Sequence, residues 1–226
     1  MKKFCFLLLI ATLLFSCKQG GQQNKKNDDK PVITVTIEPL RYFTEAIAGD
    51  EFTVVSMVPK GSSPETYDPT PQQLVDLARS KAYFRIGYIG FEQTWTDKLT
   101  DNAPHLQFFD MSQGVDLIYD NTHSHRHAED GKEHHHATGV EPHIWNSATN
   151  AQIIAGNILS ALCSIDKSNE SAYLERYNAL CRQIEHTDSL IRQTLTAPGA
   201  DHAFMIYHPA LSYFAVSYTH LTLPTT

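Results

Sequence analysis

Short runs of β-branched and aromatic residues alternate with segments of helical character in the first half of the chain. From these runs we predict strands at residues 32–37, 52–57, 82–86 and 107–110. Helices are predicted between them at residues 42–47, 71–80 and 92–99. Strands that alternate with helices form a parallel sheet with helices on both faces, which is the α/β class. Residues 31–120 are therefore expected to fold as one N-terminal α/β lobe.

The second half of the chain changes character because residues 147–163 and 168–195 carry apolar positions at helical spacing with almost no Gly or Pro. A helix over 168–195 would extend roughly 40 Å at about 1.5 Å per residue, which is the span of a domain. We interpret residues 141–197 as linking helices, of which the longer is a rigid backbone between two lobes. Residues 198–215 then start a C-terminal lobe, with its first strand at 203–207.

The C-terminal end of the chain is short for this architecture. Too few residues follow Tyr207 to form the several strands and helices of a second α/β lobe. We therefore expect a C-terminally truncated chain with the second lobe largely missing, and we interpret residues 216–226 as a non-native tail. A true short C-terminus is the alternative.

The first seventeen residues have the pattern of an export signal. Lys2 and Lys3 precede an apolar run over residues 4–15, which is of signal-peptide length and short for a membrane span. Ser16 followed directly by Cys17 resembles a bacterial lipobox, so residues 1–17 are interpreted as a lipoprotein signal peptide with Cys17 lipidated. A plain secretory signal with an incidental cysteine is the alternative. Both place the mature protein in the periplasm or at the cell surface, and the lipid would anchor it to the membrane.

The composition of the remaining chain limits the classes of partner that it can bind. Residues 18–30 are nearly free of apolar side chains and are predicted to be a flexible tether. The formal net charge of −7 leaves no basic footprint for phosphates, which excludes nucleic acid and favours a cation. Cys163 and Cys181 lie in helical sequence and are predicted to be small buried hydrophobic residues, in preference to a disulfide or a thiolate site.

Half of the 12 histidines lie in a segment at residues 121–140 that also contains acidic residues. Imidazole is the commonest metal ligand, but a flexible run does not impose a coordination geometry. We interpret the segment as a mobile loop that collects or senses metal, with a merely solvated or tag-like loop as the alternative. The possible auxiliary ligands are His123, His125, His127, His134, His135 and His136.

Two further histidines stand at the edges of predicted elements. His143 follows Pro142 and precedes a helix that Asn146 or Ser147 could cap, and His208 follows a predicted strand and precedes a proline. A stiff neighbouring backbone preorganises a ligand, as tight metal binding requires. Either histidine alone could be structural. Together with the His-rich loop they favour a metal site.

Three segments give the chain a family resemblance. Residues 38–87, EPHIWNSATNAQIIAGNI at 141–158 and YHPALSYFA at 207–215 resemble, in this order, the metal-binding solute receptors of zinc and manganese ABC transporters, cluster A-I or bacterial solute-binding protein family 9. The resemblance implies two α/β lobes joined by one rigid helix, with the metal between them. It also implies a ligand set of three histidines and one carboxylate.

The resemblance assigns ligands residue by residue. His143 matches the second family histidine and His208 matches the third. The first is usual in a Pro-His-x-Tyr context, and here Glu65 takes its place in the sequence PETY. Glu65 is therefore predicted as an unusual third ligand; alternatively, a loop histidine such as His123 or His125 fills the position. The family's carboxylate ligand would lie in the second lobe, beyond this sequence.

The function implied by the resemblance is capture of an extracytoplasmic transition-metal ion and its delivery to an ABC permease and its ATPase by a monomeric receptor. Histidine ligands favour Zn²⁺ over Mn²⁺, which prefers more oxygen ligands, whereas Glu65 acts in the opposite direction. A surface adhesin or a metal-storage lipoprotein is the alternative. A zinc hydrolase is remote because the sequence contains no HExxH or GxSxG motif, so no enzymatic activity is predicted.

Overall fold

A four-stranded parallel sheet lies at the centre of the fold in the computed structural model, which describes residues 30–119, 139–201, 204–208 and 210–218. The strand order is β2-β1-β3-β4, and Val35 of β1 pairs with Ser56 of β2 and with Phe84 of β3. Each of the four strands predicted in the N-terminal lobe is present, although the first three are shorter than predicted. The strands are β1 (Val32–Val35), β2 (Thr53–Ser56), β3 (Ala82–Arg85) and β4 (Gln107–Asp110).

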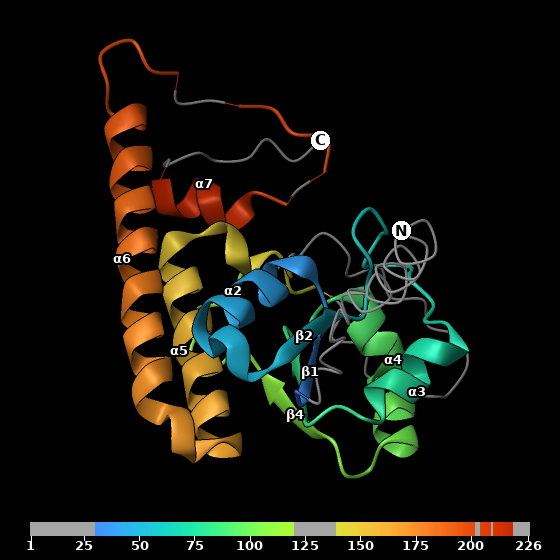
Figure 1. The fold of residues 1–226 in the computed structure, drawn as a ribbon. Coiled ribbons are helices and arrows are strands. Elements are labelled where there is room, and N and C mark those ends of the chain that lie inside the picture. The colour runs from blue at the N-terminus through green and yellow to red at the C-terminus, as the bar shows by residue number, and fades with distance from the viewer. Residues whose placement is uncertain (1–29, 120–138, 202–203, 209, 219–226) are drawn as a thin grey trace, which may run out of the picture. The chain divides into compact units, whose positions relative to one another are not determined.

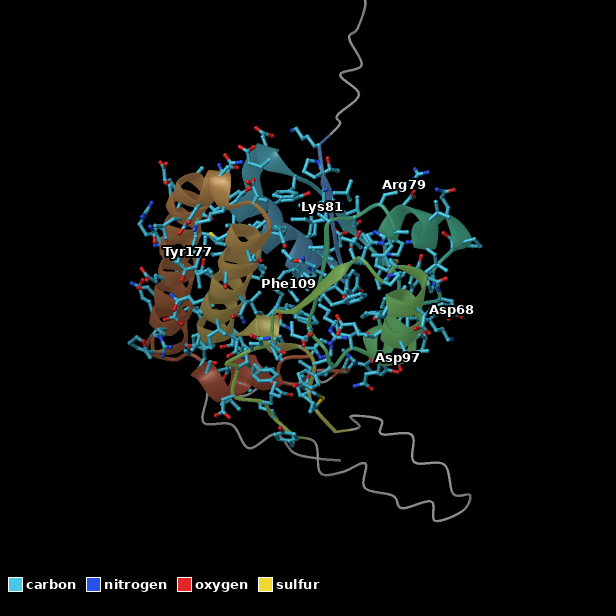
Figure 2. The ribbon with its side chains drawn as sticks, turned by 90° about the horizontal axis from the view of Figure 1, so that it is seen from below. Asp68, Arg79, Lys81, Asp97, Phe109 and Tyr177 are labelled. Carbon is cyan, nitrogen blue, oxygen red and sulfur yellow. The ribbon has the colours of Figure 1, made fainter. Side chains whose placement is uncertain are left out.

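Helices cover the two faces of this sheet. The chain passes from β1 to β2 on one side, and then returns past β1 to β3 and continues to β4. Because parallel crossovers are right-handed, α2 lies on one face of the sheet and α3 and α4 lie on the other. Figure 1 shows this arrangement, and in Figure 2 Phe109 of β4 lies between Tyr177 and Asp97, which belong to helices on opposite sides. The predicted α/β lobe is confirmed. The helices are α2 (Glu38–Ala48), α3 (Pro71–Leu77) and α4 (Gly90–Asn102).

A pair of long helices packs beside α2 (Figure 1). α5 spans Ala148–Ile165 and α6 spans Glu170–Leu195, joined by the short 3₁₀ helix η4 (Lys167–Asn169). Ser147 accepts a hydrogen bond from the amide of Asn150 and caps α5, as the sequence predicts. The 26 residues of α6 extend about 39 Å. Both long helices are therefore present close to where they were predicted.

Arg176 joins α6 to the α/β lobe. Its Nε donates a 2.7 Å hydrogen bond to the carbonyl of Ile47, and its Nη2 donates one of 2.9 Å to the carbonyl of Ala48. These carbonyls belong to the last turn of α2, which has no further helical partners for them. Gly49 follows with a φ of 60°, and a Cβ there would lie 2.9 Å from the guanidinium. A cation from α6 thus caps α2.

Two predictions need correction. Residues 204–208 form no strand, because a strand needs a hydrogen-bonded neighbour and the described residues provide none there. The chain instead enters helix α7 (Ser212–Tyr218), which packs against α6 and the 3₁₀ helix η3 (Ile144–Asn146). Cys163 and Cys181 are free and half-buried, so the predicted burial is only partial and the alternative disulfide is not formed. The signal peptide, most of the tether, the His-rich segment and the end of the tail lie outside the described residues.

Candidate metal centre

His143 lies in a buried position directly before η3. The chain leading to it is fixed by a bridge between Tyr119 and Val140 and by a 2.9 Å hydrogen bond from the amide of Glu141 to the carbonyl of Ile118. The imidazole packs against Trp145 at a centroid distance of 5.2 Å, and the residue is 8% exposed. The backbone around His143 is therefore held by contacts within the fold.

Glu141 orients the His143 ring. Its Oε1 is hydrogen-bonded to Nδ1 of His143, and the backbone amide of His143 donates to the same oxygen at 3.1 Å. A carboxylate accepts and cannot donate, so Nδ1 carries the proton and the neutral ring presents its lone pair at Nε2. Metal-binding histidines are commonly held in this way by a carboxylate. Glu141 is not among the predicted site residues, although a carboxylate two residues before a candidate ligand is a usable signal.

His208 faces His143 across a short distance. The two Nε2 atoms are 3.2 Å apart, and the rings stand edge to face with centroids 4.9 Å apart. Two imidazole nitrogens bound to one Zn²⁺ at about 2.05 Å in tetrahedral geometry would be separated by about 3.3 Å. The observed spacing is that of a hydrogen bond between the two rings, and it is also close to the spacing of two ligands on one ion. The structure brings together these two predicted site residues from 65 positions apart in the sequence.

The segment after His208 is attached to the same part of the fold. The buried Tyr213 hydroxyl accepts a 3.0 Å hydrogen bond from the amide of Ile118 and donates one of 3.0 Å to the carbonyl of Glu141. Burial raises the pKa of this phenol above its ordinary value. Asn146 adds a 2.7 Å hydrogen bond from Nδ2 to the carbonyl of Ala210. Helix α7 is therefore attached to the backbone that bears His143, which places His208 beside it.

Glu65 lies apart from the two histidines. It is exposed on the segment between β2 and α3, and its Oε2 accepts a 3.0 Å hydrogen bond from the amide of Gly90 at the start of α4. Within the described ranges, no three His, Cys, Asp or Glu side chains gather in a group that could hold a metal ion. The structure therefore does not bring Glu65 to the histidine pair. Cys17 and the six loop histidines lie outside the described residues.

A hollow of about 210 Å³ is lined by one neighbour of Glu65 and one of His143, although neither Glu65 nor His143 lines it. It lies where β1 and β2 end, the edge at which parallel sheets usually bind ligands. Pro64, which precedes Glu65, and Trp145, which packs on His143, both line it.

Known proteins resemble this chain over most of its length. The family profile described as ZnuA, zinc-uptake complex component A, periplasmic, matches residues 33–222. The iron ABC transporter substrate-binding lipoprotein MtsA of Streptococcus pyogenes is 29% identical over 227 residues, which cover 96% of this chain and 69% of that protein. The manganese ABC transporter substrate-binding lipoprotein PsaA of Streptococcus pneumoniae is 28% identical, with coverage of 96% and 70%.

Solved structures agree with these sequence matches. A crystal structure of ZnuA matches with a TM-score of 0.73 at 33% identity, covering 84% of this chain and 68% of that one. The chain thus spans about two thirds of the length of these relatives. The family resemblance predicted from the three motifs is confirmed. The chain belongs to the ZnuA family, the non-enzymatic, metal-binding components of ABC metal-uptake systems.

Proposed function

We propose that this protein captures Zn²⁺ outside the cytoplasm and delivers it to an ABC permease. The observation that carries the proposal is the histidine pair, with Nε2 atoms 3.2 Å apart and one ring held by Glu141. The pair presents two imidazole nitrogens at a spacing close to that of a tetrahedral zinc site. Nothing in the proposal requires that a bond of the cargo be made or broken by the protein, in keeping with a binding function.

The choice of Zn²⁺ rests on the chemistry of the ligands. Imidazole suits zinc, whereas Mn²⁺ prefers oxygen. The relatives differ in what their names state, since MtsA is described for iron and PsaA for manganese. Mn²⁺ is the less favoured cargo, which Glu65 as a third ligand would help to hold by adding a carboxylate oxygen. A histidine of the 121–140 segment is the alternative third ligand, and the remaining loop histidines would be auxiliary.

The partners follow from the family. We propose that a monomer, anchored through lipidated Cys17 at the periplasmic or cell surface, passes the ion to a permease driven by an ATPase. Long helix α6 would serve as the rigid link to a second lobe, from which the fourth ligand would come. Labelling cells with a radioactive or alkyne-tagged fatty acid tests the anchor, since Cys17→Ala should abolish incorporation.

The ligand assignment is tested by competition with a chromogenic zinc chelator. His143→Ala and His208→Ala should each weaken binding by at least about a hundredfold, exceeding the usual effect of losing an outer-shell partner. The matched control is His186→Ala, which removes an exposed imidazole from α6. Binding that survives replacement of both His143 and His208 would contradict the assignment.

A further inference from the structure

The hydroxyl group of Tyr213 connects α7 to the backbone that leads into His143. The side chain is 4% exposed, and its oxygen accepts a hydrogen bond from the amide of Ile118 and donates one to the carbonyl of Glu141, each at 3.0 Å. One oxygen atom thus provides a partner for a backbone donor and a backbone acceptor on two separate segments. Losing the hydroxyl would leave both groups without this partner at a buried position, which is costly.

A second connection between the two histidine segments runs through Asn146. The backbone amide of Asn146 donates to the carbonyl of His143 at 3.2 Å, and its Nδ2 donates to the carbonyl of Ala210 at 2.7 Å. The amide of Ala210 donates in turn to the carbonyl of His208 at 2.7 Å. Three hydrogen bonds in series therefore join the backbone of one histidine to the backbone of the other, and none of them involves an imidazole ring.

His208 depends on these connections more than His143 does. His208 is exposed, and residues 204–207 before it form no helix or strand. Phe204 in that stretch contacts Phe214 of α7, with ring centroids 6.1 Å apart. The residues on both sides of His208 in the sequence are therefore attached to α7. A ligand on such a segment lowers the metal affinity by its cost of ordering, unless the fold has ordered it beforehand.

We propose that Tyr213 and Asn146 are positioning residues that hold His208 against His143 and thereby raise the affinity of the histidine pair for the ion. The inference rests on the proposed function and adds to it two residues that do not touch the metal. Tyr213 acts by fixing α7, and Asn146 acts by fixing Ala210. The cost of ordering His208 then falls on folding and not on metal binding.

The test measures the Zn²⁺ affinity of the full chain by chelator competition, with a urea unfolding curve for every variant. Tyr213→Phe keeps the buried ring and removes only the hydroxyl, and Asn146→Ala removes the amide that bonds Ala210. Each change should weaken Zn²⁺ binding by roughly tenfold, as expected for loss of an outer-shell partner. In a His208→Ala background, Tyr213→Phe should have no further effect on the residual affinity, because no second ligand remains to be positioned.

Two matched controls separate positioning from a general loss of stability. Tyr173→Phe removes a buried hydroxyl that donates to Asp166 at 2.6 Å. Asn157→Ala removes an amide that donates to the carbonyls of Met111 and Gln113, each at 2.9 Å. Both control variants should lose stability but keep the parental Zn²⁺ affinity, because neither set of bonds joins the two histidine segments.

Parental Zn²⁺ affinity in Tyr213→Phe or in Asn146→Ala would overturn the assignment of that residue. Equal weakening in the control variants, or equal weakening by Tyr213→Phe with and without His208, would overturn the inference as a whole. Loss of binding in His143→Ala would still support the proposed function in each of these cases. If Tyr213→Phe does not fold, the comparison of Asn146→Ala with Asn157→Ala decides the question alone.

Discussion

Replacing Glu141 tests whether the orientation of His143 contributes to metal affinity. One carboxylate oxygen accepts hydrogen bonds from both the ring and the backbone amide of His143. The two side chains are only 10% and 11% exposed, so water neither screens the interaction nor easily replaces it. Glu141→Ala leaves Nδ1 without its acceptor and lets the ring rotate or change tautomer.

The expected loss can be stated from these contacts. Outer-shell partners of metal-binding histidines typically contribute ten- to a hundredfold in affinity, which is about 1.4 to 2.7 kcal/mol. Because both side chains are nearly buried, the loss of affinity in Glu141→Ala should lie near the upper end of this range. Glu141→Gln keeps an acceptor oxygen but loses the charge, so it should lie between parent and Glu141→Ala.

The assay is chelator competition with Zn²⁺ at fixed pH and ionic strength, accompanied by a thermal unfolding curve for each variant. The order parent, Glu141→Gln, Glu141→Ala should appear in affinity. The reasoning is refuted if both variants bind like the parent while His143→Ala loses binding, because ring orientation would then contribute nothing.

Two further predictions concern stability. Arg176→Ala should lower the free energy of unfolding, measured by urea titration, by about 2 kcal/mol, because two carbonyls of α2 lose a charged donor. Arg176→Lys should lower it by less. Parental stability in both variants would contradict the capping role. The hydrogen bonds from Ser168, Tyr173 and Asn169 lower the pKa of Asp166 from 3.8 to about 2. Because this pKa is lower in the folded state, Asp166 contributes stability above pH 3.8 that is lost as the pH falls toward 2. Asp166→Asn should therefore make the free energy of unfolding depend less on pH between these values. An unchanged pH dependence would contradict the prediction.

Local patterns predicted the lobe well because its elements are specified by neighbouring residues. β1 and β3 are mostly buried runs of β-branched, aromatic and small residues, and the alternation of all four strands with helices favours parallel pairing. Helix α2 begins four residues before the predicted range, since Pro39 fits the first turn of a helix and does not interrupt it. The strand predicted at 203–207 was wrong because periodicity does not reveal whether a neighbouring strand exists to pair with it.

The candidate site was predicted only in part. Proline neighbours and family motifs identified His143 and His208, but their 3.2 Å separation depends on the packing of α7, which no local pattern contains. Glu141 and Tyr213 were missed because each acts through hydrogen bonds to other residues. Such contacts depend on distances between segments that a single sequence does not give.

His143 and His208 face each other from the two ends of the segment that contains α5 and α6. An ion shared by the two rings would close a loop of 65 residues that contains both α5 and α6, as a reversible counterpart of a disulfide. The bound ion would then connect the segment after α6 to the segment before α5. Release of the ion would remove this connection without changing the sheet. The melting temperature should accordingly rise with free Zn²⁺ concentration, and α7 should gain more protection from hydrogen exchange than β1.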